Sequence, residues 1–225
     1  TDLREFLGPA HFTARYFDLR SQIFSREPAR VAIFGGAFNP PSLHHRQIVM
    51  ELLNWFDRVV VLPSGIRDSK ESLKTVLGKQ RKEMVLLNFS DLPGVVVDTF
   101  DLDNEVFTPT YLLDERYKQQ YAGKEIWHVV GGDLVRGGSQ GKAEIQRVWK
   151  KGEEIWRTLN FTVVVRPGFS LEPQDLPPSA ETIEGLDLWG SSTLTRERLP
   201  RGQDVKPLLL PEVYDYIEKF GLYRN

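Results

Sequence analysis

The sequence predicts an α/β fold in which a doubly wound parallel sheet is flanked by helices, and three observations support this class. Five short apolar runs are each bounded by glycine or proline, stretches with helical spacing separate them, and 40% of the 225 residues are hydrophobic. Continuous apolar runs are typical of strands that helices cover on both faces. A chain of this length can bury one core. We expect a single domain over residues 30–225 and a helical N-terminal extension over residues 1–29.

Strands and helices are expected to alternate along the chain. The predicted strands are apolar runs that cover residues 30–34, 59–62, 95–97, 126–130 and 161–165. The predicted helices begin after the first strand and then cover residues 77–90, 109–121 and 143–155. Thr108 is expected to cap the helix that Pro109 begins. A proline-rich connection, residues 167–178, leads to a last strand at residues 186–189. This alternation predicts a Rossmann-like sheet.

The composition excludes several classes of function. The formal net charge is -2, so no global attraction to nucleic acid or anionic lipid is expected. The chain has no cysteine, which excludes disulfides, thiolate nucleophiles and cysteine zinc sites. No run of about 18 apolar residues is present. We therefore expect a cytoplasmic protein with no nucleic-acid or membrane partner, and association into a homo-oligomer is left open.

The turn after the first strand is the first candidate site. Ligands of open parallel sheets bind beyond the carboxyl ends of the strands, where a helix N-terminus attracts phosphate. Gly35 and Gly36 allow backbone amides to approach an anion closely, and Ser42, His44 and His45 add hydroxyl and imidazole groups. The glycine patterns of dinucleotide-binding and P-loop proteins are both absent. A phosphate site of another kind is predicted, the alternative being that one histidine only caps the helix or packs on the sheet.

Residues 191–196 form a second candidate phosphate site. Ser191, Ser192 and Thr193 open a short predicted helix, and Arg196 lies on the same face. Hydroxyl groups at a helix start often serve only as caps. Here hydroxyls, backbone amides and one guanidinium converge, which favours an anion site.

Residues 35–45 resemble the signature of the nucleotidyltransferase superfamily, and more specifically that of bacterial nicotinate mononucleotide adenylyltransferases. The two glycines, Phe38, the Asn-Pro pair and His45 match, whereas Ser42 and His44 stand where the family has a histidine and a glycine. Residues 191–196 are similar to a second family motif. Further landmarks follow in the family's order, so that the resemblance covers most of residues 30–223; they are Pro63, Ser64, Lys70, Arg81, Met84, Phe107, Thr108, Leu112, Gly131, Asp133, Trp149 and Arg166.

The resemblance implies transfer of AMP from ATP to nicotinate mononucleotide, which gives nicotinate adenine dinucleotide and pyrophosphate. The residues implied in catalysis are His45, Ser42, Lys70 and Arg196. Those implied in ATP binding are Gly35, Gly36, Ala37, Phe38, His44, Gly131, Asp133, Ser191, Ser192 and Thr193. Those implied in acceptor binding are Phe107, Thr108, Trp149 and Arg166. The expected cofactor is Mg²⁺ carried by ATP, without a protein metal site.

This chemistry requires no general base, because the acceptor phosphate is already an anion; alignment and charge neutralisation suffice. One alternative is an adenylyl- or cytidylyltransferase with another acceptor, such as nicotinamide mononucleotide or phosphopantetheine. A second is a nucleotide-binding module without catalysis, suggested by Ser42, His44 and the altered residues 106–111. Asp133 could instead cap a helix, and Trp149 could belong to the core. His128, inside a predicted strand, is expected to be a satisfied core histidine.

Overall fold

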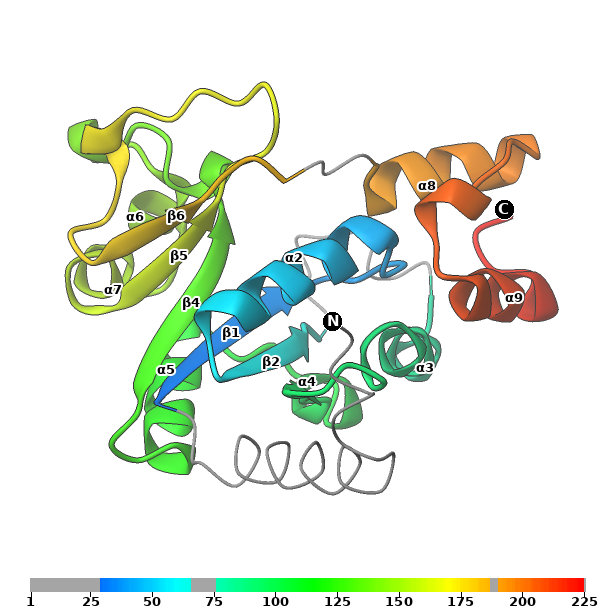
Figure 1. The fold of residues 1–225 in the computed structure, drawn as a ribbon, viewed down its shortest axis with the longest axis horizontal. Coiled ribbons are helices and arrows are strands. Elements are labelled where there is room, and N and C mark those ends of the chain that lie inside the picture. Colours follow the sequence, from blue (N-terminus) through cyan, green and yellow to red (C-terminus); the bar gives the residue numbers. More distant parts are fainter. Residues whose placement is uncertain (1–28, 66–75, 187–189, 225) are drawn as a thin grey trace, which may run out of the picture.

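The computed structural model describes residues 29–65, 76–186 and 190–224. Within them, six parallel strands form one sheet in the order β3-β2-β1-β4-β5-β6 (Figure 1). The strands are β1 (Arg30–Gly36), β2 (Arg58–Pro63), β3 (Val95–Val97), β4 (Glu125–Gly131), β5 (Asn160–Val164) and β6 (Ala180–Ile183). The direction of winding reverses between β1 and β4. A crevice for a ligand is expected beyond the carboxyl ends of these two strands.

The first five strands confirm their predictions to within two residues at each end. The prediction of the last strand was wrong, since β6 lies at Ala180–Ile183 and Leu186 is not in a strand; residues 187–189 lie outside the described residues. The reason is that β6 is an edge strand that pairs only with β5 and carries polar side chains such as Glu181. An edge strand needs no continuous apolar run, so the pattern pointed to the wrong segment.

Helices cover both faces of the sheet. On one face, α2 (Leu43–Trp55) and α3 (Gly78–Phe89) pack on β1 and β2 through a shared apolar cluster. On the other face lie α5 (Thr110–Gln120), α6 (Glu144–Val148) and α7 (Gly152–Thr158). Short segments connect these elements: α4 (Phe100–Asp103), η2 (Gly132–Leu134), η3 (Gly138–Gln140) and η4 (Pro173–Asp175). The doubly wound arrangement predicted from the sequence is therefore present.

Two helix predictions require correction. The helix expected over residues 143–155 is broken into α6 and α7, because the chain folds back at Lys151, whose φ of 57° is left-handed. Gly152 then lies so close to α6 that a Cβ atom would be 2.2 Å from the carbonyl oxygen of Ile145. Thr108 is not the cap of α5, whose N-cap is Pro109. The Thr108 hydroxyl donates instead to the carboxylate of Asp101 at 2.6 Å.

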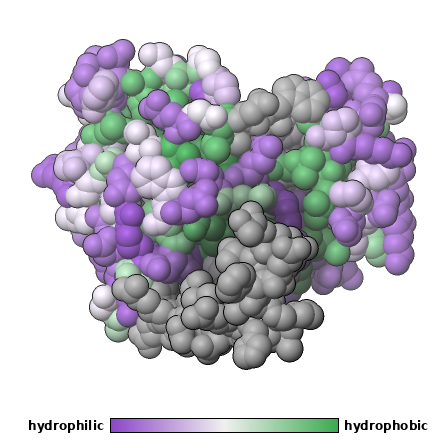
Figure 2. All heavy atoms as spheres, in the orientation of Figure 1, coloured by the Kyte–Doolittle hydropathy of each residue, from purple (hydrophilic) through white to green (hydrophobic). Residues whose placement is uncertain are grey.

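The C-terminal segment forms a small helical layer beside α3. It contains α8 (Ser192–Arg198), η5 (Leu199–Arg201), η6 (Lys206–Leu208) and α9 (Pro211–Phe220). Its apolar side chains pack with Val76 and with Met84 of α3. Figure 1 shows α8 and α9 at the opposite side of the molecule from β5 and β6. In the same view, hydrophilic residues cover most of the outer margins, and hydrophobic residues show in two groups, one on the side of β5 and β6 and one on the inner side of the C-terminal layer (Figure 2).

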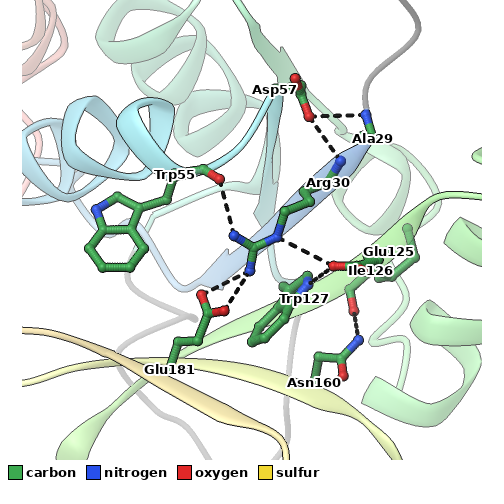
Figure 3. Close-up of polar contacts among 9 residues, drawn as sticks. All are labelled: Ala29, Arg30, Trp55, Asp57, Glu125, Ile126, Trp127, Asn160 and Glu181. Atoms are coloured by element: carbon green, nitrogen blue, oxygen red, sulfur yellow. Dashed lines mark hydrogen bonds and ion pairs between the residues drawn. The ribbon is translucent and has the colours of Figure 1, made fainter.

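The amino ends of the strands are fastened by Arg30 at the start of β1 (Figure 3). Its guanidinium donates to both carboxylate oxygens of Glu181 on β6, at 2.9 and 2.8 Å, and lies 3.4 Å from Glu125 on β4. It also lies over the rings of Phe56 and Trp127, at 4.7 and 4.6 Å from their centroids. This cluster stabilises the sheet at the end away from the crevice, which leaves the carboxyl ends free for a ligand.

No helix in the described residues has the length and apolar character to cross a bilayer. The predicted N-terminal extension over residues 1–29 lies, apart from Ala29, outside the described residues.

Candidate functional site

A cavity of about 380 Å³ opens at the carboxyl ends of β1 and β4, where the winding reverses. Its lining combines residues that the sequence assigned to different roles. From the predicted ATP set it contains Gly35, Gly36, Ala37, Phe38, His44, Gly131 and Asp133. From the catalytic and acceptor sets it contains His45, Phe107, Thr108, Trp149 and Arg166. The remaining predicted residues that are described lie outside the lining, and they are Ser42, Ser191, Ser192, Thr193 and Arg196. Lys70 lies outside the described residues.

Two arginines bind backbone carbonyl oxygens of the glycine turn, residues 35–42. Arg81 of α3 donates from Nη1 to the carbonyl oxygen of Ala37 at 2.8 Å. Arg196 of α8 donates from Nη1 to the carbonyl oxygen of Asn39 at 2.6 Å. Neither guanidinium has a carboxylate partner among the described residues. Two positive charges therefore lie behind the turn, where they make its electrostatic potential more favourable to an anion.

The C-terminal segment adds two further contacts to the glycine turn. Ser192 donates from Oγ to the carbonyl oxygen of Pro40 at 2.8 Å. The Tyr223 hydroxyl donates to Oδ1 of Asn39, whose side chain is fully buried. In this structure, Ser192 and Arg196 of the second predicted phosphate motif thus position the glycine turn. Ser191 of the same motif caps α8 by accepting from the amide of Leu194.

The Phe38 side chain packs the glycine turn against the core. Its ring is 1% exposed and packs edge-on against Phe34 and Phe89, with centroids 5.4 and 5.6 Å apart. Its φ of 43° is left-handed, and a Cβ at Gly36 would lie only 2.9 Å from the ring, so glycine is required there. Within the described chain, the backbone amides of Ala37 and Phe38 donate no hydrogen bond. These amides are available to a phosphate.

Ser42, the N-cap of α2, lies between two imidazoles. Its Oγ is 2.6 Å from Nδ1 of His44 and 2.9 Å from Nδ1 of His45. Its backbone amide also donates to Nδ1 of His45 at 3.2 Å. The two rings lie against each other with centroids 3.8 Å apart, and the His45 ring also contacts Phe38. Ser42 thus organises both histidines although it does not line the cavity.

Residues 33–198 match the model of the cytidylyltransferase-like family. The chain belongs to this family. Nicotinate-nucleotide adenylyltransferase of Bacillus subtilis is 26% identical over 200 residues, which cover 87% of this chain and 99% of that protein. A probable nicotinate-nucleotide adenylyltransferase of Geobacillus thermodenitrificans is 29% identical over 196 residues, which cover 86% of each chain. Among solved structures, Plasmodium falciparum nicotinic acid mononucleotide adenylyltransferase complexed with NaAD shares the fold with a TM-score of 0.66, at 23% identity over 86% of this chain and 97% of that chain.

In this cytidylyltransferase-like domain, the loop that carries Phe107 and Thr108 depends on a residue that the sequence did not reveal. Asp101 of α4 is 1% exposed, and its carboxylate accepts from the amide and the hydroxyl of Thr108 at 3.0 and 2.6 Å. Its carbonyl oxygen accepts from the amide of Val106. Asp101 therefore fixes the loop that presents Phe107 and Thr108 to the cavity.

The other predicted lining residues differ in how firmly they are held. Trp149 is half-buried and packs beside the cluster that joins α6 and α7 to the sheet. Asp133 is exposed, caps no helix, and its carboxylate lies where a Cβ at Gly131 would be 2.4 Å away. The Arg166 guanidinium is exposed at the rim and has no ion-pair partner among the described residues. Arg166 is thus a cation that an anionic ligand could pair with.

His128 is a satisfied core histidine, as predicted, although its ring also lines the cavity. It is 4% exposed, and its Nε2 lies 3.1 Å from Oδ1 of Asp114, which also binds Lys118 at 2.7 Å. The lysine and the histidine lower the pKa of Asp114, and this effect outweighs the opposing effect of burial. Across the described parts of the chain, no three His, Cys, Asp or Glu side chains gather closely enough to hold a metal ion.

Burial and the charge of Arg166 lower the pKa of His44 from 6.5 to about 4. The pKa of His45 is lowered in the same direction by burial, His44 and Arg166. A folded-state pKa below the unfolded value stabilises the fold above pH 6.5, and this stabilisation is lost as the pH falls toward 4. We expect His44 to account for roughly 3 kcal/mol of that loss.

The measurement is the free energy of unfolding by urea at several pH values between 7 and 4, taken about one unit apart. His44→Asn, which cannot be protonated in this range, should show a shallower fall than the parent. Parallel curves for the two proteins would contradict the assignment.

Arg81 is expected to lower the stability of the fold. It is fully buried, burial lowers its pKa, and its Nε and Nη2 atoms have no hydrogen-bond partner. An unpaired buried cation destabilises a fold unless a ligand uses its charge. We expect Arg81→Met to melt at or above the parent temperature while its Kd for ATP rises about tenfold, since the positive charge behind Ala37 is lost.

Calorimetry and equilibrium ATP binding test this prediction together. Lys82→Met is the matched control, because Lys82 lies on the same helix but binds Asp103, at 2.7 Å, away from the turn. Its ATP affinity should equal that of the parent. A lower melting temperature in Arg81→Met with unchanged ATP affinity would show that Arg81 is purely structural.

Proposed function

We propose that this chain transfers AMP from ATP to nicotinate mononucleotide and releases pyrophosphate. The observation that carries the proposal is that one cavity, about 380 Å³ in volume, is lined both by the glycine turn and by the aromatic loop around Phe107. The triphosphate and the mononucleotide would meet in this cavity. The relatives' names, which specify nicotinate, favour this acceptor over the others.

In the proposed reaction, an oxygen of the acceptor phosphate attacks the α-phosphorus of ATP, and the bond to the leaving pyrophosphate breaks. The attacking group is already an anion, so the protein need not remove a proton. Its contribution is to align the two phosphates and to stabilise the charge that develops on pyrophosphate. This requirement fits a turn that offers the backbone amides of Ala37 and Phe38 beside the imidazoles of His44 and His45.

We assign the triphosphate to the amides of Ala37 and Phe38 and to His45. Arg81 and Arg196 act through the turn, since their guanidinium groups bind its carbonyl oxygens. Magnesium would arrive with ATP and neutralise phosphate charge, bound by phosphate oxygens and water. Lys70 is proposed as a further cation. Because ATP is a cytoplasmic substrate, the proposed reaction places the protein in the cytoplasm.

We assign the pyridine ring to the side of the cavity that contains Trp149 and Phe107. Both aromatic side chains line the cavity and keep exposed surface, 38% in the case of Phe107, on which a flat ring can stack. Thr108 is fixed by Asp101, and Arg166 offers a charge to an anionic group of the acceptor.

The test is pyrophosphate release with ATP, magnesium and, in separate reactions, nicotinate mononucleotide, nicotinamide mononucleotide and phosphopantetheine. We expect the nicotinate acceptor to react with the highest kcat/KM. Preference for another acceptor would overturn the substrate assignment but keep the enzyme class. ATP binding without pyrophosphate release from any acceptor would overturn the catalytic proposal and indicate a nucleotide-binding module.

A further inference from the structure

The two positions at which the chain departs from the glycine-turn signature, Ser42 and His44, contact each other and His45. The Ser42 hydroxyl lies at hydrogen-bond distance from one nitrogen of each ring, 2.6 Å from Nδ1 of His44 and 2.9 Å from Nδ1 of His45. Both contacts are enclosed, since Ser42 is 1% and His44 2% exposed. A hydroxyl has one proton, so it can donate to only one of the two rings.

The backbone decides which ring receives that proton. The amide of Ser42 donates to Nδ1 of His45 at 3.2 Å, and an amide can act only as a donor. Nδ1 of His45 must then be an unprotonated acceptor, and neutral His45 carries its proton on Nε2. The Ser42 hydroxyl must also donate to this acceptor, because otherwise two lone pairs would face each other. Its oxygen is left to accept from a protonated Nδ1 of His44.

We propose that His44 and Ser42 form a chain of two hydrogen bonds that fixes His45 as a neutral imidazole, with its Nε2–H group available to the triphosphate. His44 is then a positioning residue that acts through Ser42. The role toward a triphosphate rests on the proposed function, but the arrangement of protons belongs to the protein without ligand. The direction of the chain is from Nδ1–H of His44, through the hydroxyl of Ser42, to Nδ1 of His45.

The charged groups around the His44 and His45 rings favour neutral forms of both imidazoles. Among the described residues, the other titratable side chains that line the same cavity come from five other segments, and they are Asp101, His128, Asp133, Glu144 and Arg166. Of these, Arg166 acts on both imidazoles and opposes a positive charge on either. The hydroxyl and amide of Ser42 oppose a proton on Nδ1 of His45 as well. His45 therefore binds as a hydrogen-bond donor, while Arg81 and Arg196, which bind the turn, supply the positive charge.

The test is the pattern of imidazole nitrogen-15 shifts in long-range proton–nitrogen spectra of the ligand-free full chain at pH 7. His45→Gln and His44→Asn assign the signals by subtraction. We expect a pyridine-type Nδ1 and a pyrrole-type Nε2 for His45, and a pyrrole-type Nδ1 for His44. In Ser42→Ala the backbone amide still donates to Nδ1 of His45, so the His45 pattern should persist, whereas Nδ1–H of His44 loses its acceptor and His44 should become a mixture of its two neutral forms. A pyrrole-type Nδ1 on His45 in the parent, or an unchanged His44 pattern in Ser42→Ala, would overturn the proposal.

Activity measurements separate positioning from a purely structural role. Ser42→Ala and His44→Leu should each lower kcat about tenfold, with the KM of the acceptor unchanged. His44→Asn keeps an N–H donor near the position of Nδ1 and should recover most of the rate, whereas recovery in His44→Leu would contradict the chain. If the nitrogen shifts are as expected and no acceptor reacts, the proposed function fails while the hydrogen-bond chain stands.

Discussion

His45→Ala is expected to lower kcat/KM for pyrophosphate release by about 10² to 10³, the usual loss when a donor that stabilises developing phosphate or oxyanion charge is removed. The reason is that His45 joins the cavity lining to the start of α2 and is held by Ser42 at both its hydroxyl and its amide. Its ring contacts Phe38 at 5.1 Å between centroids, but it is not part of a core cluster. The fold should therefore remain intact. Initial rates and a melting curve on the same preparation measure both effects.

His45→Gln is the matched control for this prediction. A glutamine amide nitrogen reaches close to the position of Nε2 and keeps an N–H donor without an imidazole. We expect the kcat/KM of His45→Gln to be at least about tenfold higher than that of His45→Ala. His45→Ala retaining more than a tenth of the parent kcat/KM would remove His45 from the catalytic set. Equal loss in the glutamine variant would instead mean that a donor alone is insufficient.

Gly65→Ala is expected to destabilise the fold by at least about 3 kcal/mol, which lowers Tm by roughly 10 °C in a chain of this size. A Cβ atom at Gly65 would lie 1.7 Å from the carbonyl oxygen of Val106 and 3.0 Å from that of Asp101. Both neighbours are backbone, so neither can move aside alone. The displaced loop carries Phe107 and Thr108, and the KM for the acceptor should rise more than the KM for ATP.

Gly78→Ala is the control for Gly65→Ala. Its Cβ would lie 3.7 Å from the nearest atom, the carbonyl oxygen of Leu102, and it stands at the first position of α3. This variant should melt within about 2 °C of the parent. If the two alanine variants melt alike, the contact between Gly65 and the loop is looser than the structure implies, and the acceptor loop is not fixed from that side.

Much of the fold could be predicted because its signals are local. Strands such as Val59–Leu62 are buried on both faces, so their apolar runs identify them without knowledge of their neighbours. The edge strand β6 could not be found in this way, since three of its four residues are only partly buried. The break between α6 and α7 also depends on a contact, the approach of Gly152 to Ile145, and no period in the sequence encodes it.

The same distinction applies to the site. The glycine turn and the Ser-Ser-Thr run are contiguous, so their residue types already predict phosphate chemistry. The role of Asp101 was missed, although Phe107 and Thr108 of the same loop were predicted, because Asp101 lies seven positions before Thr108 and no recognisable pattern links the two. Arg81 was noted as a landmark without a role, since its contact with Ala37 spans 44 residues. Whether a polar side chain faces a ligand or supports another residue depends on the folded chain.

The contact between Asn39 and Tyr223 joins residues that are 184 positions apart. Because a ribosome makes the turn early and Tyr223 near the end of the described chain, a nascent polypeptide can form the sheet around β1 long before it can immobilise this turn. Partly synthesised chains should therefore have a folded sheet around β1 yet be unable to bind a nucleotide. The timing of translation thus delays the appearance of activity until α8, α9 and Tyr223 have left the ribosome.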